Sequence, residues 1–384
     1  MNKIFSILPP RLGGVDMLIP IFIEMKKCAN VNIELIITNN SLLYQLKRDE
    51  FLYQQILSIA DTVTNLPVKN NRDIKGIKKI FFMINTLWVG VGVAYRMLSN
   101  SKSVLMHSDT LNGKLVNIFD KFIKIRSGIT VGHFKLMDLT NSKRSNFGEI
   151  FLCHKEKDSD LWNVRDKDKC IYIGYPRLYK SWIKEIKKSS KYYLENNVVG
   201  YKKDRDLLVI FLPSTVENIF GKSELEKWVI EVVTCLRRVF VNSFIIFKPH
   251  PMQDMKHLKG VLNKIYCAEF SLSFLHPGLL ASQAKVVVSH HSSTIIDALA
   301  LNIPVVQHQF FTNHWLDRWP KGSEFVELVH VWTQNKRELE KELIKIRDNN
   351  YIYSNFNNKI GHKENLSVFF KKINLSSYKG ENLE

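Results

Sequence analysis

The chain has 384 residues, 45% of them hydrophobic, and a formal net charge of +18. This length suits two domains rather than one core, and the hydrophobic content excludes a largely disordered chain. The charge surplus calls for an anionic partner, but no helix-turn-helix, zinc or RNA-binding motif is present, so we expect no nucleic acid partner. Five scattered cysteines without a CxxC pair indicate reduced thiols.

The amino terminus is predicted to form a strand at 2–8, a glycine-containing loop at 9–16 and a helix at 17–29. The first apolar run is cut by two prolines and two glycines, which is not typical of a secretory signal, so we expect a cytoplasmic protein. The loop lacks the GxGxxG fingerprint and does not indicate an NAD site. A strand at 33–39 and a helical region at 41–60 follow.

Residues 80–94 (IFFMINTLWVGVGVA) are apolar and uncharged, and they follow the basic stretch KNNRDIKGIKK at 69–79. A membrane span needs ~20 such residues, and this segment is shorter and contains Asn85. We therefore expect a buried helix or a membrane-docking helix rather than a span.

A second strand, turn and helix occur within 103–140, with a polar turn HSDT at 107–110 and a later strand ending in a GH turn at 132–133. This order resembles the amino-terminal domain of the nonhydrolysing UDP-GlcNAc 2-epimerases, which carries an HGDT turn and a later GHVEAG turn. Ser108 replaces the glycine of that motif and Lys135 its glutamate. The resemblance thus implies the GT-B topology more than epimerase chemistry.

The string GYPR at 174–177 follows a predicted strand and resembles the point where surface-glycan GT-B enzymes pass into the interdomain linker. We expect an amino-terminal domain at 1–185 and a carboxyl-terminal domain at 186–384, whose last helix can cross back to the first domain. Residues 179–205 are basic and aromatic. That composition suits an anionic membrane surface, although solvated helix faces are often lysine-rich too.

Three strands of the second domain are predicted to end in polar side chains, at DLLVIFLPST (206–215), FIIFKPHP (244–251) and VVVSHHSST (286–294). Ligands of open doubly wound sheets bind outside the carboxyl ends of the strands. The helix after the SST turn would add free backbone N–H groups and a positive dipole end. These features predict an anion site.

KPHP, the SST turn and the later phrase NIPVV resemble the carboxyl-terminal domain of bacterial surface-polysaccharide glycosyltransferases of GT-B fold. Kdo transferases, sialyltransferases and polysialyltransferases with HP and SS motifs, and teichoic acid polymerases share versions of these strings. The resemblance implies an α/β fold of two Rossmann-like doubly wound domains facing a cleft. The implied donor-binding residues are Ser214, Thr215, Lys248, His250, Pro251, Ser292, Ser293 and Thr294. Alternatively, His250 caps a turn and the serines cap a helix.

The resemblance also implies the acceptor side of the cleft, in the amino-terminal domain. We expect Asp109, then His133, then His107, as the base that takes the proton of the acceptor hydroxyl. Asp109 has the alternative of an ordinary helix N-cap, which does not exclude catalysis.

The expected function is an inverting glycosyltransferase that needs no metal or other cofactor. The HP and SS strings favour a CMP-activated acidic sugar, such as a sialic-acid-like nonulosonate or Kdo, and a cell-surface polysaccharide or lipid-linked glycan as acceptor. We expect peripheral binding at the inner face of an anionic cytoplasmic membrane. Two alternatives remain, namely a polyol-phosphate transferase or epimerase on this fold, and a noncatalytic anion- or membrane-binding protein. Three D-x-D strings, at 158–160, 166–168 and 204–206, have the charged surroundings of solvated linkers.

Overall fold

The computed structural model describes residues 3–28, 30–66, 77–98, 103–108, 128–131, 148–154, 169–213, 215, 220–251, 253–265, 269–309, 328–329, 331–350 and 365–373. The chain divides into two compact units, residues 1–182 with 361–384 and residues 183–360. The division lies inside helix α6 (Lys180–Asn197), the same helix in which the sequence analysis put the boundary at 185/186. The acceptor and donor roles of the two units stay a prediction.

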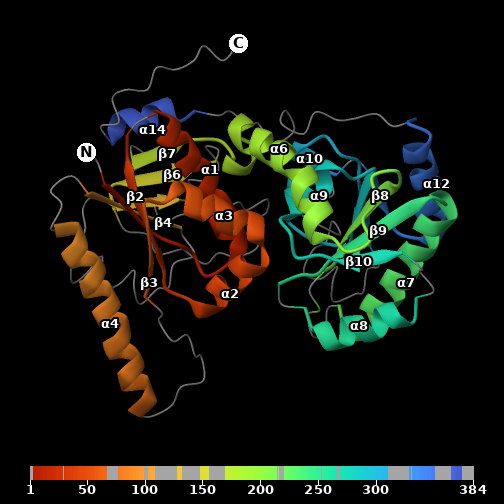
Figure 1. Ribbon diagram of the computed structural model, residues 1–384, viewed down its shortest axis with the longest axis horizontal. Helices are drawn as coiled ribbons and strands as arrows, with labels where there is room; N and C mark the ends of the chain where they lie inside the picture. The colour runs from red at the N-terminus through yellow and green to blue at the C-terminus, as the bar shows by residue number, and fades with distance from the viewer. Residues whose placement is uncertain are drawn as a thin grey trace. The chain divides into compact units, whose positions relative to one another are not determined.

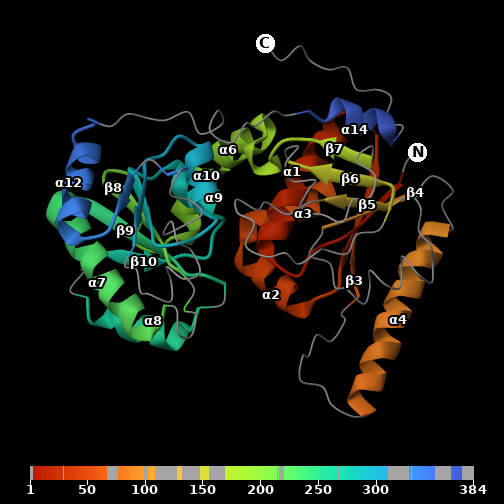
Figure 2. The same ribbon diagram turned by 180° about the vertical axis from the view of Figure 1, so that it is seen from behind.

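The first unit contains a sheet of parallel strands in the order β3-β2-β1-β4-β5-β6-β7. The strands are β1 (Lys3–Ile7), β2 (Asn32–Ile37), β3 (Thr62–Asn65), β4 (Ser103–Ser108), β5 (Gly128–Val131), β6 (Ile150–Cys153) and β7 (Cys170–Tyr172). The helices are α1 (Leu12–Cys28), α2 (Asn40–Arg48), α3 (Glu50–Ile59), α4 (Ile77–Leu98), the short 3-10 helix η4 (Pro176–Leu178) and α14 (Ser367–Lys372). Figures 1 and 2 show α1, α2 and α3 on one face of this sheet and α4 on the other.

Helix α1 begins earlier than the sequence predicts. The predicted loop at 9–16 contains Gly13 and Gly14, but the helix already starts at Leu12, and the backbone N–H groups of Gly14 and Val15 donate to the carbonyl of Arg11 at 3.1 and 3.4 Å. Val15 is fully buried. The prediction of a glycine loop was wrong because the burial of this first turn outweighs the weak helix propensity of glycine.

The second unit contains a sheet of parallel strands in the order β10-β9-β8-β11-β12-β13. The strands are β8 (Asp206–Phe211), β9 (Ser243–Lys248), β10 (Phe270–Leu272), β11 (Val286–Ser289), β12 (Val305–His308) and β13 (Val331–Thr333). The remaining helices are α7 (Lys222–Val239), α8 (Met255–Asn263), α9 (Pro277–Ser282), α10 (Ile295–Ala300) and α12 (Lys336–Arg347). Helices α7, α8 and α12 lie on one face of this sheet and α9 and α10 on the other (Figure 1).

The strand sequences explain why both sheets are covered on two faces. In β8 the residues from Leu207 to Phe211 are buried, and in β11 all four residues are buried. Strands of parallel sheets read as continuous apolar runs because helices cover both faces. Each unit is therefore a doubly wound α/β layer structure, as the sequence predicts.

The connection after β7 depends on a glycine and on a buried ion pair. Gly174 has a φ of 73°, in the left-handed region, and the Tyr179 hydroxyl donates to the carbonyl of Ile173 at 2.9 Å. Arg177 of η4 lies 3.8 Å from the carboxylate of Asp16 on α1, and both side chains are 7% exposed. The GYPR string thus holds the last strand of the first unit against its first helix.

Helix α4 is the described counterpart of the apolar segment at 80–94, and one of its faces is buried. In the described part of the chain, no helix has both the length and the apolar content to cross a membrane.

Candidate functional site

The three predicted donor-binding strings converge on one edge of the second sheet. Strand β8 pairs in parallel with β9 on one side and with β11 on the other. The chain leaves β8 toward β9 and β10, then returns to β11 on the opposite side, so β8 lies at the topological switch point. The ends of β9 and β11 are not neighbours. They lie about 10 Å apart with the end of β8 between them, since parallel strands are spaced by nearly 5 Å.

Lys248 is the last residue of β9, and its ammonium group has a structural role. Its Nζ donates to the carbonyls of Leu275 and Phe274 at 2.6 and 3.3 Å, which ties the end of β9 to the loop after β10. The group therefore supplies a fixed positive charge at this edge. His250 follows two residues later, half-buried, and its backbone carbonyl accepts from Gln253 N at 2.9 Å, while Pro251 is exposed.

The SST turn after β11 is held by its own hydroxyls. Ser292 Oγ lies 2.8 Å from Thr294 Oγ1 and accepts from the N–H of Thr294 at 3.4 Å, while Ser293 is exposed. Helix α10 begins at Ile295, and no side-chain hydrogen bond caps its start. The hydroxyls thus form a turn of the Ser/Thr type rather than the simple cap that was the alternative. At the end of β8, Thr215 is half-buried and Ser214 lies outside the described residues.

Two further residues at this edge were missed by the sequence analysis. Gln253 is only 8% exposed, and neither its Nε2 nor its Oε1 has a hydrogen-bond partner in the structure of the described residues. An amide buried in this way carries a desolvation cost that a ligand can relieve. Asp297, 2% exposed, lies in the first turn of α10. Neither residue stands in a recognisable string, so only a structure could single them out.

His290 and His308 belong to the core of the second unit. The ring of His290 is fully buried and lies 4.3 Å from the ring of Phe220, centroid to centroid. His308, also fully buried, has its Nδ1 2.9 Å from Thr333 Oγ1 and its Nε2 3.1 Å from Glu231 Oε1. Burial lowers the pKa of His308 to about 4 and raises the pKa of Glu231. The imidazole is therefore neutral at pH 7 and donates to the Glu231 carboxylate.

The predicted base residues of the first unit are described only in part. His107 lies within β4, in register with Ile7 of β1 and Thr130 of β5, and is fully buried. The predicted turn at 107–110 was therefore wrong at its start, because the ladder with β1 and β5 continues the strand to Ser108. Asp109 and His133 lie outside the described residues.

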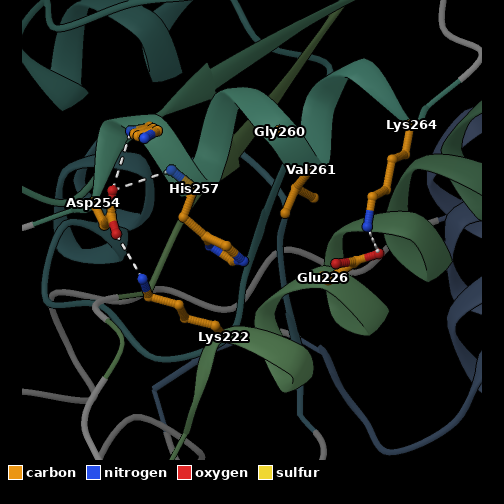
Figure 3. Close-up of a pocket in the computed structure, with 8 residues that line it drawn as sticks. Lys222, Glu226, Asp254, His257, Gly260, Val261 and Lys264 are labelled. Atoms are coloured by element: carbon orange, nitrogen blue, oxygen red, sulfur yellow. Dashed lines mark hydrogen bonds and ion pairs between the residues drawn. The ribbon is translucent and has the colours of Figure 1, made fainter.

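A groove of about 350 Å³ lies elsewhere in the second unit, between α7 and α8 (Figure 3). Four of its charged side chains form two ion pairs, since Lys222 Nζ lies 2.7 Å from Asp254 Oδ2 and Lys264 Nζ lies 2.8 Å from Glu226 Oε1. Lys256 also lines the groove. The hydrogen bond from Lys222 is the main cause that lowers the pKa of Asp254 to about 2. None of the predicted donor residues lines this groove.

In the described chain, no other metal-ligating side chains join the aspartates of the D-x-D strings to form a metal site. Asp204 and Asp206 precede and begin β8, so they lie at the amino edge of the sheet, opposite the three donor strings. The other two strings, at 158–160 and 166–168, fall outside the described residues. Within the described ranges, no group of three or more His, Cys, Asp or Glu side chains is placed to hold a metal ion.

Comparison with protein-family models finds no match, and comparison with curated protein sequences finds none either. Solved structures do match. The UDP-GlcNAc 2-epimerase of Methanocaldococcus jannaschii superposes with a TM-score of 0.60 at 16% identity, over 92% of this chain and 95% of that chain. The UDP-GlcNAc 2-epimerase of Neisseria meningitidis, bound to UDP-GlcNAc, does so with a TM-score of 0.57 at 12% identity, over 97% and 99%. The putative epimerase of Listeria monocytogenes gives 0.59 at 14% identity, over 96% and 93%.

At these identities the similarity establishes the fold and no activity. It confirms the resemblance to the 2-epimerases at the level of fold, while the closer resemblance to Kdo transferases and sialyltransferases stays a prediction. The chain has a GT-B-type fold, built from two parallel α/β units.

Proposed function

We propose that the protein is an enzyme that binds a nucleotide-activated sugar in its second unit and transfers the sugar to a glycan acceptor. The observation that carries the proposal is the convergence of three polar strand ends at the switch point around β8. Ligands of open α/β sheets bind at such a point. Solved proteins that share the fold, among them the epimerase bound to UDP-GlcNAc, support a nucleotide sugar as the ligand class.

The chain itself offers what transfer without a metal requires. Negative charge grows on the leaving phosphate, and fixed donors already in place stabilise it best. Lys248 supplies a fixed positive charge, His250 an imidazole, and Ser292 and Thr294 hydroxyl groups at the same edge. The free backbone N–H groups expected after this turn are not found from Thr294 to Ile296, because these groups donate to Ser292 and Ser293. A base in the first unit, with Asp109 proposed first, then His133 and His107, takes the proton of the acceptor hydroxyl. Direct attack by that hydroxyl inverts the anomeric carbon.

The finer assignments extend this proposal. The HP and SS strings favour CMP as the nucleotide and an acidic sugar such as Kdo or a nonulosonate, with a cell-surface polysaccharide or lipid-linked glycan as acceptor. The net charge of +18 favours an anionic membrane surface, and we propose the inner face of the cytoplasmic membrane as the site of the enzyme. No metal or other cofactor enters the scheme.

A 2-epimerase activity is the second candidate, and the match of epimerase structures over more than nine tenths of the chain favours it. Two residues of the epimerase motif are replaced, by Ser108 and Lys135. The replacement of a glutamate by a lysine reverses a charge where proton transfer would occur, which favours transfer to an acceptor.

Product analysis distinguishes the two activities. The protein is incubated with CMP-sialic acid, CMP-Kdo or UDP-GlcNAc, with and without a capsule-type oligosaccharide, and products are separated by chromatography. The proposal predicts acceptor-dependent release of CMP that persists in EDTA. Conversion of UDP-GlcNAc to its 2-epimer without an acceptor would establish the epimerase instead, and loss of activity in EDTA with rescue by Mn²⁺ would contradict the metal-free scheme.

A further inference from the structure

In the part of helix α4 whose side chains the structure describes, residues 84–97, one face packs on the sheet. Thr86, Val89, Val93 and Met97 are at most 7% exposed and recur every three or four residues, as one face of a helix requires. Arg96 fixes this helix further, because its guanidinium pairs with Glu34 of β2 and donates to Thr64 Oγ1 at 3.0 Å. The position of α4 is thus determined by its inner face.

The opposite face of α4 is apolar as well. The exposed side chains are Ile84 (45%), Leu87 (49%), Trp88 (70%), Val91 (45%) and Tyr95 (73%). They are spaced by three, one, three and four residues, which puts them on one stripe turned away from the inner face. In Figures 1 and 2, no described helix or strand lies alongside α4 on the side away from its sheet. A helix packed on a core normally turns polar residues outward, and no charged residue occurs from Ile80 to Tyr95.

We propose that this stripe docks on an anionic lipid bilayer, with α4 lying in the plane of the headgroups. The sequence that leads into α4 fits such a surface, because residues 69–79 contain five lysines and arginines against one aspartate, and α4 contains no acidic residue. Two of these cations, Lys78 and Lys79, belong to the first turn of α4. Trp and Tyr are the side chains that favour the membrane interface. Two copies of α4 packed through this stripe would bring together helices that contain Lys78 and Lys79 and no acidic residue, and this like charge opposes self-association.

Docking through α4 would bring lipid to the first unit, in which we propose that the acceptor binds. The proposed base residues Asp109 and His133 follow strands β4 and β5 of its sheet in the sequence. Trp88 also lines a cavity of about 530 Å³ together with Asn40 and Leu66, which follow the carboxyl ends of β2 and β3. Docking through α4 specifies the proposed membrane association. Its biological role rests on the proposed function, but the binding itself does not. Binding to vesicles needs neither nucleotide sugar nor turnover, so the inference and the proposed activity can fail separately.

The segment at 179–205 is less suited than α4 to be the main docking surface. Two of its aromatic side chains, Tyr179 and Trp182, are fully buried, and the Trp182 ring lies 5.5 Å from the ring of Phe51. Tyr192 and Val199 are 65% and 83% exposed. They provide a matched control on a basic, exposed surface of the same chain.

The test is sedimentation of the full chain with phosphatidylglycerol-containing vesicles and with pure phosphatidylcholine vesicles, at low and high salt. We expect binding to the anionic vesicles, weakened by salt, and a fall of about tenfold or more in partitioning for the double variant Trp88→Ser/Tyr95→Ser, because two large apolar side chains are lost. The control Tyr192→Ser/Val199→Ser should bind as the wild type does. Thermal unfolding checks that the variants fold, and Leu87→Ser/Val91→Ser provides a second pair if the first is destabilised.

Three results would overturn the proposal. The first is equal partitioning of the wild type and both α4 variants on anionic vesicles. The second is loss of binding in the control pair alone, which would assign docking to the segment at 179–205. The third is a wild-type dimer by light scattering that the α4 variants dissociate, together with no vesicle binding, which would identify the stripe as a contact between copies.

Discussion

His308 is a neutral histidine in the core of the second unit, and its burial makes stability depend on pH. Glu231, Glu338 and Thr333 face it from α7, α12 and β13, and Lys336 acts on Glu231. A hydrogen bond with Thr333 and the charge of Glu338 favour the imidazolium, but burial outweighs them, so the pKa of His308 falls from the ordinary 6.5 to about 4. Protonation of His308 is therefore less favourable in the folded state than in the unfolded chain.

Because the pKa is lowered in the folded state, the contribution of His308 is fully present above pH 6.5 and is lost as pH falls toward 4. Between pH 8 and pH 5 we expect the free energy of unfolding to drop by about 2 kcal/mol more for the wild type than for His308→Gln. Urea unfolding at the two pH values measures this difference. Equal pH dependence of the two proteins would show that His308 is protonated in the folded state.

Within the GYPR string, the backbone conformation at position 174 requires a glycine. Its φ of 73° is costly for any side chain with a Cβ, so Gly174→Ala should destabilise the first unit by about 1–2 kcal/mol. Gly260 of α8 is the matched control, because a Cβ there meets nothing within 4 Å and alanine favours a helix. Thermal unfolding should show a lower midpoint for Gly174→Ala and an equal or higher one for Gly260→Ala. A silent Gly174→Ala would mean that this turn relaxes without cost.

Asp109 is the residue that we predict to act as the catalytic base. Asp109→Asn should lower turnover by on the order of 10²-fold while nucleotide binding stays unchanged, because the donor residues belong to the other unit. If Asp109 only caps a helix, the same variant should be nearly silent, since asparagine caps about as well. Activity retained in Asp109→Asn and lost in His133→Ala would assign the base to His133 instead.

At the scale of elements, the turn between β11 and α10 should be sensitive to loss of a hydroxyl. Ser292→Ala removes the partner of Thr294 and, in the proposed site, a hydroxyl donor that this partner holds in place. We expect at least a tenfold loss of turnover from the loss of this preorganised hydroxyl, with little change in the thermal midpoint. Ser282→Ala is the matched control, because its hydroxyl bonds only to the carbonyl of Leu279 at the far end of α9. Equal rates for both variants would remove this turn from the site.

Some elements were predictable because their signal is local. The strands at 33–39, 206–215, 244–251 and 286–289 appear as β2, β8, β9 and β11, since each is a short apolar run that ends in polar residues. The ends of these runs also identified the donor strings. Local signals sufficed wherever burial on both faces gives a continuous apolar pattern.

Other elements depend on contacts that are distant in the sequence. The continuation of β4 through His107 follows from its ladders with β1 and β5, and the burial of Trp182 follows from its packing on Phe51. The position of β8 between β9 and β11 is likewise a matter of strand pairing. The burial of Gln253 has no sequence signal at all. Pairing and burial of this kind are tertiary effects, which local propensity does not contain.

At the scale of the whole molecule, two features bear on the proposed function. The fold brings the three candidate donor strings to the carboxyl edge of the second sheet, where we propose that a nucleotide sugar binds. The first unit carries an apolar stripe on α4, which follows a basic stretch in the sequence. The fold alone permits both transferases and epimerases, so the residues at the sheet edge must decide between them.

The most direct test of the central claim is a calorimetric titration of CMP and UDP into the wild type, His250→Ala and Ser282→Ala. The account predicts saturable binding of CMP, tighter than that of UDP, which His250→Ala weakens by about tenfold or more through loss of a phosphate contact and Ser282→Ala leaves unchanged. Undiminished binding in His250→Ala, or no binding of either nucleotide to the wild type, would contradict a donor site at this edge of the sheet.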